Sequence, residues 1–240
     1  MRNTARLIDL HKSFARHLRA EGASDRTATI YGQAVRFFSA WLESNGREPV
    51  LEELTRAAIR EWLAQLAEVN EPSTVKTRYR GLFRFCGWLV DEEEIPEHPM
   101  RTLSPPQPKA KPVPVLTDAE LTALLKTCAG KEFRDRRDEA MIRVLLDCGI
   151  RVSELCGLTV DGVDLDQGMA LVRGKGNKVR PVYFGARTAR AVDRYIRLRS
   201  TQRWSHLDAL FLTQRGALTP DGARERMKVR GTQAGIEDLH

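Results

Sequence analysis

The stretch IPEHPMRTLSPPQPKAKPVPV, residues 95–115, divides the chain, because seven of the chain's eleven prolines fall between Pro96 and Pro114. Proline lacks the backbone N–H that a helix uses and it fixes φ, so this density forbids a helix and favours an extended, stiff connection. The sequence therefore predicts two domains, residues 1–95 and residues 116–240, joined by a linker over residues 96–115.

The part before the prolines is predicted to be an all-helical domain. Apolar residues recur there at helical spacing in four segments, which cover residues 4–20, 25–44, 56–67 and 74–90. Candidate N-caps precede three of these segments and glycines follow two, and these residues are Ser24 or Asp25, Thr55, Ser73, Gly22 and Gly46.

The part after the prolines combines helix and strand patterns. Thr117 and Glu120 have the spacing of a capping box, and residues 136–149 predict a long apolar helix that ends at Gly149. MALVRGKGNKVRPVYFG, residues 169–185, predicts two short strands around a Gly–Lys turn. The remaining expected elements are a helix over residues 186–203, a buried strand at ALFLT (209–213) and a helix with Thr219 as cap and Pro220 in its first turn. The predicted class is α+β, mainly helical with a small antiparallel sheet.

The charge of the chain is compatible with a polyanionic partner. Lys and Arg number 39 against 32 Asp and Glu, a formal net charge of +7, and residues 118–240 hold 22 basic and 17 acidic residues. Many proteins with other partners share such an excess, so the charge alone leaves nucleic acid as one possibility among several.

The predicted helix over residues 74–90 carries a basic stripe. Lys76, Arg80 and Arg84 repeat every four residues on one face with Thr77 beside them, and no acidic residue interrupts the helix. A solvated face usually mixes signs, whereas a stripe of one sign suits phosphate contacts. We therefore expect these four residues to bind DNA, with an ordinary solvated face as the alternative.

Other function classes lack support in the sequence. Charged residues break every apolar run before membrane-spanning length, and the N-terminus has no apolar core of a signal peptide, so a cytoplasmic protein without a membrane partner is expected. The four cysteines are far apart, which favours reduced thiols over disulfides or a zinc site. GKGNK matches neither a P-loop nor a dinucleotide motif, and we expect no metal, cofactor or small-molecule substrate.

Two neighbouring motifs carry the candidate chemistry, GIRVSELCGL at residues 149–158 and VRGKGNKVRPVYF at residues 172–184. Arg151 begins a short helix with Glu154 one turn on, so a carboxylate can fix the planar guanidinium that faces a phosphate. Lys175 lies at the tip of a glycine-rich hairpin, from which a mobile amine can protonate a leaving oxygen. The alternative is an ordinary salt bridge beside a hairpin that is basic by chance.

The two motifs together resemble the tyrosine recombinase, or phage integrase, family, and in particular its Xer-like branch. GIRVSEL is followed 24 residues after its arginine by the lysine of GKGNK, and the likeness extends over nearly the whole chain. The resemblance implies a SAM-like helical core-binding domain at residues 1–95 and part of a catalytic domain at residues 116–240. It further implies that the two lobes clamp duplex DNA, that a tyrosine attacks the scissile phosphate, and that no metal takes part.

Residue roles follow from the same resemblance. Arg151 would be the first catalytic arginine, Glu154 the acidic residue that orients the site, and Lys175 the hairpin general acid. Lys178 and Arg180, which follow in the hairpin, are expected to contact DNA. In its complete form such a protein would act as a homo-oligomer on DNA, in the cytoplasm and in association with the nucleoid.

The sequence departs from the family pattern at its end. The family's second catalytic box, an H-x-x-R segment followed by the nucleophilic tyrosine, should come after AGIEDLH, and the chain stops at His240. None of Tyr31, Tyr79, Tyr183 and Tyr195 has the required context. We therefore expect a C-terminally truncated chain that binds DNA and does not cleave it.

Two alternatives stay open beside this interpretation. The chain could be a naturally short, non-catalytic DNA-binding protein that competes for recombination sites. A third, weaker hypothesis is a helical adaptor whose basic faces bind acidic proteins.

Overall fold

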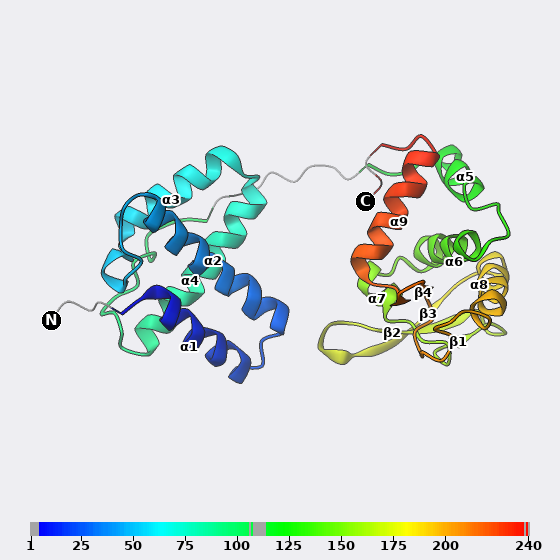
Figure 1. Cartoon of the computed structure of the whole chain (residues 1–240), viewed down its shortest axis with the longest axis horizontal. Helices are drawn as coiled ribbons and strands as arrows, with labels where there is room; N and C mark the ends of the chain where they lie inside the picture. The colour runs from blue at the N-terminus through cyan, green and yellow to red at the C-terminus, as the bar shows by residue number, and fades with distance from the viewer. Residues whose placement is uncertain (1–4, 106, 108–113, 238, 240) are drawn as a thin grey trace. The chain divides into compact units, whose positions relative to one another are not determined.

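The computed structural model describes residues 5–105, 107, 114–237 and 239, with Lys175 described by its backbone alone. The chain forms two compact units, residues 1–112 and residues 113–240 (Figure 1). Each unit has its own apolar core and is described by itself.

The first unit is a bundle of helices, as the sequence predicts. Its elements are α1 (Leu7–Ala20), α2 (Asp25–Ser44), the short 3-10 helix η1 (Leu51–Glu53), α3 (Arg56–Val69) and α4 (Pro72–Asp91). α2 packs against both α1 and α4. Its contact with α4 is close at Gly81, where an added Cβ would lie 2.7 Å from the Cβ of Ala34. Glycine at this position therefore allows the two helices to approach each other.

Helix starts in the first unit agree with the predicted caps at two of three places. The side chains of Ser24 and Thr55 accept hydrogen bonds from the first turns of α2 and α3, which confirms both as N-caps. The prediction for Ser73 is wrong, because α4 already begins at Pro72 with Glu71 as the N-cap residue. Proline is well suited to the first helical position, where the N–H that it lacks would have no partner within the helix.

The first residues of the segment expected as a linker pack on α4. Met100 is fully buried in the core of the first unit. The hydroxyl of Tyr79 donates to the carbonyl oxygen of Leu103 at 2.6 Å, and the ring of His98 lies 4.3 Å from that of Phe83. Most of the proline-rich stretch after residue 105 lies outside the described residues.

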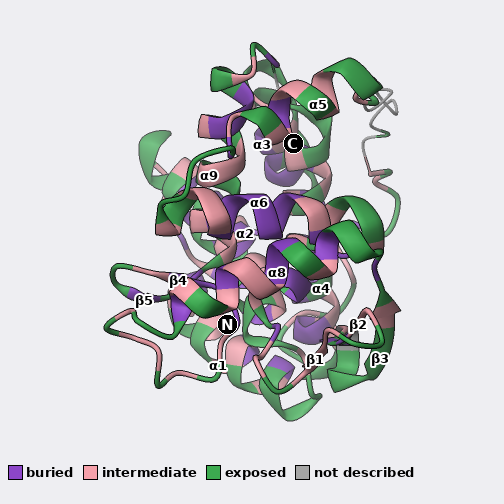
Figure 2. Cartoon of the chain, turned by 90° about the vertical axis from the view of Figure 1, so that its right-hand side faces the viewer, coloured by how far each residue is buried: buried purple, intermediate pink, exposed green. Residues whose placement is uncertain are grey.

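The second unit has the α+β architecture that the sequence predicts. Its helices are α5 (Asp118–Lys126), α6 (Phe133–Cys148), α7 (Val152–Cys156), α8 (Ala186–Arg199) and α9 (Pro220–Gln233). Its strands are β1 (Val163–Asp164), β2 (Met169–Arg173), β3 (Val179–Tyr183), β4 (Leu212–Thr213) and β5 (Gly216–Ala217), with the 3-10 turn η2 (Lys175–Asn177) between β2 and β3. The first three strands form one antiparallel sheet and the last two form another. α6 packs against α7, α8 and α9, and much of it is buried (Figure 2).

Two elements of the second unit are shorter than predicted, and Arg199 accounts for the shorter strand. The helix expected over residues 186–203 ends at Arg199, and the strand expected over residues 209–213 is limited to its last two residues. The guanidinium of Arg199 is buried and donates to the carbonyl oxygens of Ala209 at 2.8 Å and Leu210 at 3.0 Å. These carbonyl groups therefore bind a side chain instead of a neighbouring strand.

A buried ion cluster joins α6 to α9. Asp138 on α6 is fully buried, and its Oδ1 accepts a hydrogen bond from Arg137 Nη2 at 2.7 Å. Its Oδ2 accepts hydrogen bonds from Arg226 Nη2 at 2.8 Å and from Arg230 Nε at 2.9 Å, both on α9. Arg230 also donates to the carbonyl oxygen of Thr127, just after α5. The carboxylate thus ties α6 to α9, and Arg230 extends the contact to the end of α5.

Candidate functional site

Arg151 occupies the N-cap position of α7, where the chain turns out of α6. The turn passes through Gly149, whose φ of +58° is a left-handed conformation that favours glycine. The Arg151 side chain is 77% exposed. Its guanidinium group is therefore accessible to an external anion, while its backbone is fixed at a helix start.

The buried carboxylate of Glu154 holds Arg151 and Arg180 together. Oε2 of Glu154 accepts from the backbone N of Arg151 at 2.9 Å and from Arg180 Nη2 at 3.3 Å. Oε1 accepts from Arg151 Nη1 at 3.3 Å. The Glu154 side chain is only 5% exposed, so this contact takes place at the edge of the core. Because two guanidinium groups share one carboxylate, the group keeps an excess of positive charge for an anionic ligand.

The β2–β3 hairpin brings its glycine-rich turn to the same place. Gly174 N donates to the carbonyl oxygen of Lys178 at 2.8 Å and closes the turn. An added Cβ at Gly174 would lie 3.5 Å from Glu154 Oε1, so the base of the turn lies against the Arg151–Glu154 pair. Lys178 is exposed. The side chain of Lys175 lies outside the described part of the structure, so its role as general acid stays a prediction.

The predicted basic stripe of α4 has one member that is already paired. Thr77 and Arg80 are exposed and Lys76 is partly buried. Arg84 donates to Glu21 Oε2 at 2.6 Å, and this hydrogen bond lowers the pKa of the Glu21 carboxyl group. Glu21 comes from the turn between α1 and α2, which a pattern confined to α4 does not reveal.

The tyrosines of the second unit do not face Arg151. Tyr195 is fully buried and its hydroxyl donates to the carbonyl oxygen of Leu210, and burial raises the pKa of this phenol to about 12. Tyr183 on β3 is 65% exposed. Successive residues of a strand point to opposite faces, so Tyr183 and Arg180, three positions apart, lie on opposite faces of the sheet. Tyr183 therefore projects away from the face on which Arg180 contacts Glu154.

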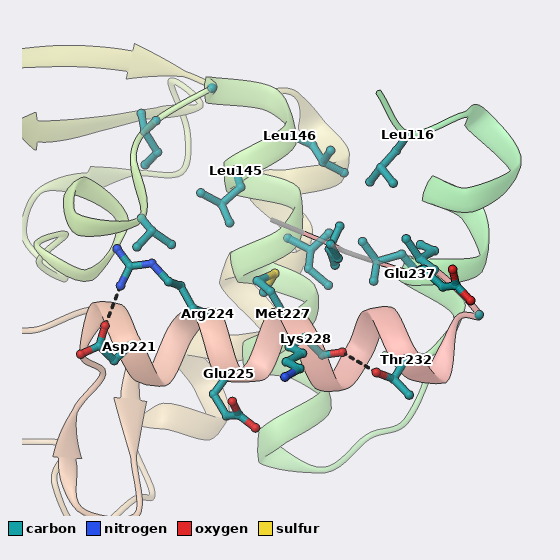
Figure 3. A pocket seen from close by; sticks show the side chains of 18 residues that line it. Leu116, Leu145, Leu146, Asp221, Arg224, Glu225, Met227, Lys228, Thr232 and Glu237 are labelled. Atoms are coloured by element: carbon teal, nitrogen blue, oxygen red, sulfur yellow. Dashed lines mark hydrogen bonds and ion pairs between the residues drawn. The ribbon is translucent and has the colours of Figure 1, made fainter. Parts of the chain in front are cut away.

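An apolar groove of about 1300 Å³ opens beside Arg151, between α6 and α9. Leu145 and Leu146 on α6 line it, Met227 lies along its α9 side, and an ion pair between Asp221 and Arg224 lies near the start of α9 (Figure 3). The residues on either side of Arg151 in the sequence also line it. Sequence patterns predicted the helices and did not predict this groove.

Within the described ranges, no group of His, Cys, Asp and Glu side chains is arranged to hold a metal ion. No helix in that part of the chain is long and apolar enough to cross a membrane.

Sequence profiles of known families match both units. The profile of the Phage integrase family matches residues 114–240, and the profile of the phage integrase N-terminal SAM-like domain matches residues 10–95. The chain belongs to the phage integrase family. This confirms the resemblance that the paired motifs indicate, and with it the SAM-like fold of the first unit.

Curated relatives of the chain are tyrosine recombinases of Xer type. Tyrosine recombinase XerD of Pseudomonas aeruginosa is 36% identical over 183 residues, which cover 74% of this chain and 59% of that protein. Tyrosine recombinase XerD of Pseudomonas putida is 32% identical over 228 residues, which cover 90% of this chain and 74% of that protein.

Solved structures of the same fold include recombinases bound to DNA. A λ integrase dimer bound to a COC′ core site matches with a TM-score of 0.75 and 15% identity over 98% of this chain and 65% of that chain. XerH site-specific recombinase bound to a palindromic difH substrate, in a post-cleavage complex, matches with a TM-score of 0.74 and 18% identity over 96% of this chain and 69% of that chain. At these identities the likeness supports the fold.

Proposed function

We propose that this chain binds duplex DNA and holds a backbone phosphate at Arg151, as the DNA-binding and phosphate-activating part of site-specific strand exchange. The observation that carries the proposal is the exposed guanidinium of Arg151 beside Arg180, both held by the buried carboxylate of Glu154. A fixed planar fork with surplus positive charge suits the non-bridging oxygens of a phosphodiester. Relatives named as tyrosine recombinases support the same function.

The two units would have different roles on DNA. Residues 1–95 would form the core-binding domain, with Lys76, Thr77 and Arg80 on DNA phosphates, and residues 116–240 would form the catalytic part. The pairing of Arg84 with Glu21 reduces its charge toward DNA, so we rank it below the other three. Lys178 and Arg180 would contact DNA from the hairpin.

The reaction proposed at the site of Arg151 and Glu154 is a phosphoryl transfer without a metal. A tyrosine oxygen attacks phosphorus, the bond to the 5′ oxygen breaks, and a 3′-phosphotyrosyl link forms. Arg151 would stabilise the negative charge that grows on the non-bridging oxygens. Lys175 would give its proton to the departing 5′ oxygen. Glu154 would act through Arg151 as a positioning residue.

A second candidate function is DNA binding without cleavage. The observation that favours it is the placement of Tyr183 and Tyr195, neither of which faces Arg151. Such a chain would occupy recombination sites and compete with recombinases that cleave them. Both functions predict binding to duplex DNA, and they differ in whether a covalent product forms.

Assembly and location belong to the same proposal. λ integrase is described as a dimer on a core site and as a tetramer on a Holliday junction. We propose that this chain also associates with further copies of itself on DNA, and that it works in the cytoplasm at the nucleoid.

The first test is the salt dependence of DNA binding, measured by fluorescence anisotropy with a labelled duplex. Replacing Lys76 and Arg80 together by alanine should weaken binding and reduce the slope of log affinity against log salt by roughly 1.8, because each phosphate contact contributes about 0.9. The double variant Arg56→Ala with Arg60→Ala removes the same charge from exposed positions on α3 and should change the slope less. If the two double variants had equal slopes, α4 would not be the part of the first unit that contacts DNA. If the unmodified chain bound no duplex, the proposed function would be refuted.

A further inference from the structure

Between α2 and α4 of the first unit lies an arginine whose guanidinium group is held in place without a carboxylate. Nη1 of Arg78 on α4 donates to Oε1 of Gln33 on α2 at 3.2 Å. The Cζ of Arg78 lies 4.0 Å from the ring centroid of Phe37, one turn further along α2. An amide and an aromatic face thus hold the guanidinium plane in one orientation, and we call these two side chains the Arg78–Gln33 pair.

The surroundings of the pair differ from those of two other arginines of this unit that form ion pairs. Arg84 and Arg47 are each bound to a glutamate. In the described part of the chain, Arg78 has no carboxylate partner, and its one hydrogen bond uses Nη1. Burial lowers the pKa of Arg78, but an arginine keeps its proton at neutral pH. The N–H groups of Nη2 and Nε therefore remain available to an external acceptor.

The pair borders a hollow of suitable character. The hollow has a volume of about 280 Å³ and opens between α2 and the first turns of α4. Its lining consists of Ile30, Gln33, Ser73, Thr74, Thr77 and Arg78. No acidic side chain lines it, so it does not repel a nucleic acid. The pair also lies next to Thr77, which is part of the surface proposed above to face DNA.

We propose that the Arg78–Gln33 pair recognises a guanine in the major groove of the bound duplex, with Arg78 as the base-reading residue and Gln33 as its positioning residue. The inference rests on the proposed DNA binding and adds a source of sequence preference to it. Guanine presents two acceptors, N7 and O6, at the spacing of two guanidinium N–H groups. Reading a base edge needs a guanidinium fork of fixed orientation, which Gln33 and Phe37 supply.

Selection from a randomised duplex library, followed by sequencing of the bound fraction, tests this inference. The unmodified chain should enrich a sequence that contains a preferred guanine. Arg78→Lys keeps the charge and loses the fork, so preference for that guanine should fall by about 5- to 150-fold, the range of a bidentate base contact, with other positions unchanged. Gln33→Ala should weaken the same preference to a smaller extent. Arg60→Ala, an exposed arginine on α3, is the matched control and should leave every position unchanged.

The outcomes separate this inference from the proposed function. If Arg78→Lys and Gln33→Ala both keep the preference for the guanine and unfold at the same temperature as the unmodified chain, the inference is overturned and DNA binding is left intact. If Arg78→Ala weakens binding to all sequences equally and lowers the salt slope by about 0.9, Arg78 contacts a phosphate, and the inference is again overturned. An unmodified chain that binds no duplex overturns the inference together with the proposed DNA binding. An unmodified chain that binds every sequence equally overturns the inference and leaves DNA binding intact.

Discussion

Replacing Asp138 by asparagine is expected to lower the free energy of unfolding of the second unit by about 3–5 kcal/mol. Asp138 is fully buried and accepts hydrogen bonds from three arginines, of which Arg137 and Arg230 are buried as well. The asparagine variant would leave three guanidinium groups near the core without the charge that compensates them. Removing one partner of a buried ion pair costs far more than removing an exposed one, because the remaining charge stays desolvated.

The pH dependence of this effect has a definite direction. Burial by itself would raise the pKa of Asp138, but the charges of Arg137 and Arg226 and their hydrogen bonds outweigh it, and the pKa lies below its ordinary value. A carboxyl group whose pKa is depressed in the folded state contributes stability above its unfolded pKa, about 3.9, and loses that contribution as the pH falls through the folded value. The difference between Asp138→Asn and the unmodified chain should therefore be full at neutral pH and shrink only in strong acid.

Hydrogen exchange followed by mass spectrometry measures the effect one unit at a time. Peptides from residues 114–237 should lose protection in Asp138→Asn, while peptides from the first unit serve as an internal reference. The matched control is Asp221→Asn, which removes a carboxylate that is 96% exposed and pairs with Arg224. It should change protection little. Equal protection in the two variants would show that the buried cluster does not hold α9 on α6.

Local sequence patterns predicted most helices because their determinants are local. Thr117 and Glu120 of the capping box are three positions apart, and the hydrogen bonds found at the start of α5 follow that spacing. The Arg151–Glu154 contact is equally local and was predicted from GIRVSEL. In both cases the partners lie one helical turn apart, so the sequence alone determines that they can meet.

Contacts between distant segments could not be predicted in this way. Arg84 binds Glu21, 63 positions away, and Arg230 binds Asp138, 92 positions away. Arg199 shortened a predicted strand because it binds carbonyl groups of a segment that packs beside it only in the folded unit. A charge pattern on one helix shows which residues are basic, but it does not show which of them already have a partner.

The candidate site also combines local contacts, which the sequence predicted, with a contact between distant residues, which it did not. The sequence predicted Arg151, Glu154 and the hairpin, and it placed Arg180 among residues that contact DNA. The structure adds that Arg180 shares the carboxylate of Glu154, across 26 positions of sequence. Arg78 belonged to the basic residues of α4 but did not fit the four-residue stripe, and only its contacts with Gln33 and Phe37 distinguish it. The sequence thus shows which residues are basic, and the contacts in the folded protein show which of them are the better candidates for binding DNA.

The 240-residue chain is expected to form no covalent adduct with DNA, although it binds duplex DNA. Attack on a phosphate needs a tyrosine oxygen in line with the leaving 5′ oxygen and close to the clamp formed by Arg151. Tyr79 is 5% exposed and its hydroxyl is bonded to Leu103, while Tyr195 is fully buried. Tyr31 is partly buried against the core of the first unit. Tyr183 is exposed on the face of the sheet opposite Arg180.

A nicked suicide substrate tests this expectation, because the fragment released on cleavage diffuses away and traps the protein–DNA link. Adducts are resolved on a denaturing gel, with a tyrosine recombinase such as the Pseudomonas aeruginosa relative as positive control and with binding measured under the same conditions. Clear binding without a covalent band is the expected result, since binding energy comes from phosphate contacts spread over both units while cleavage needs one attacking group. A covalent band that disappears in Tyr183→Phe would refute the expectation, because it would show that the hairpin moves enough on DNA to bring this phenol to the phosphate held by Arg151.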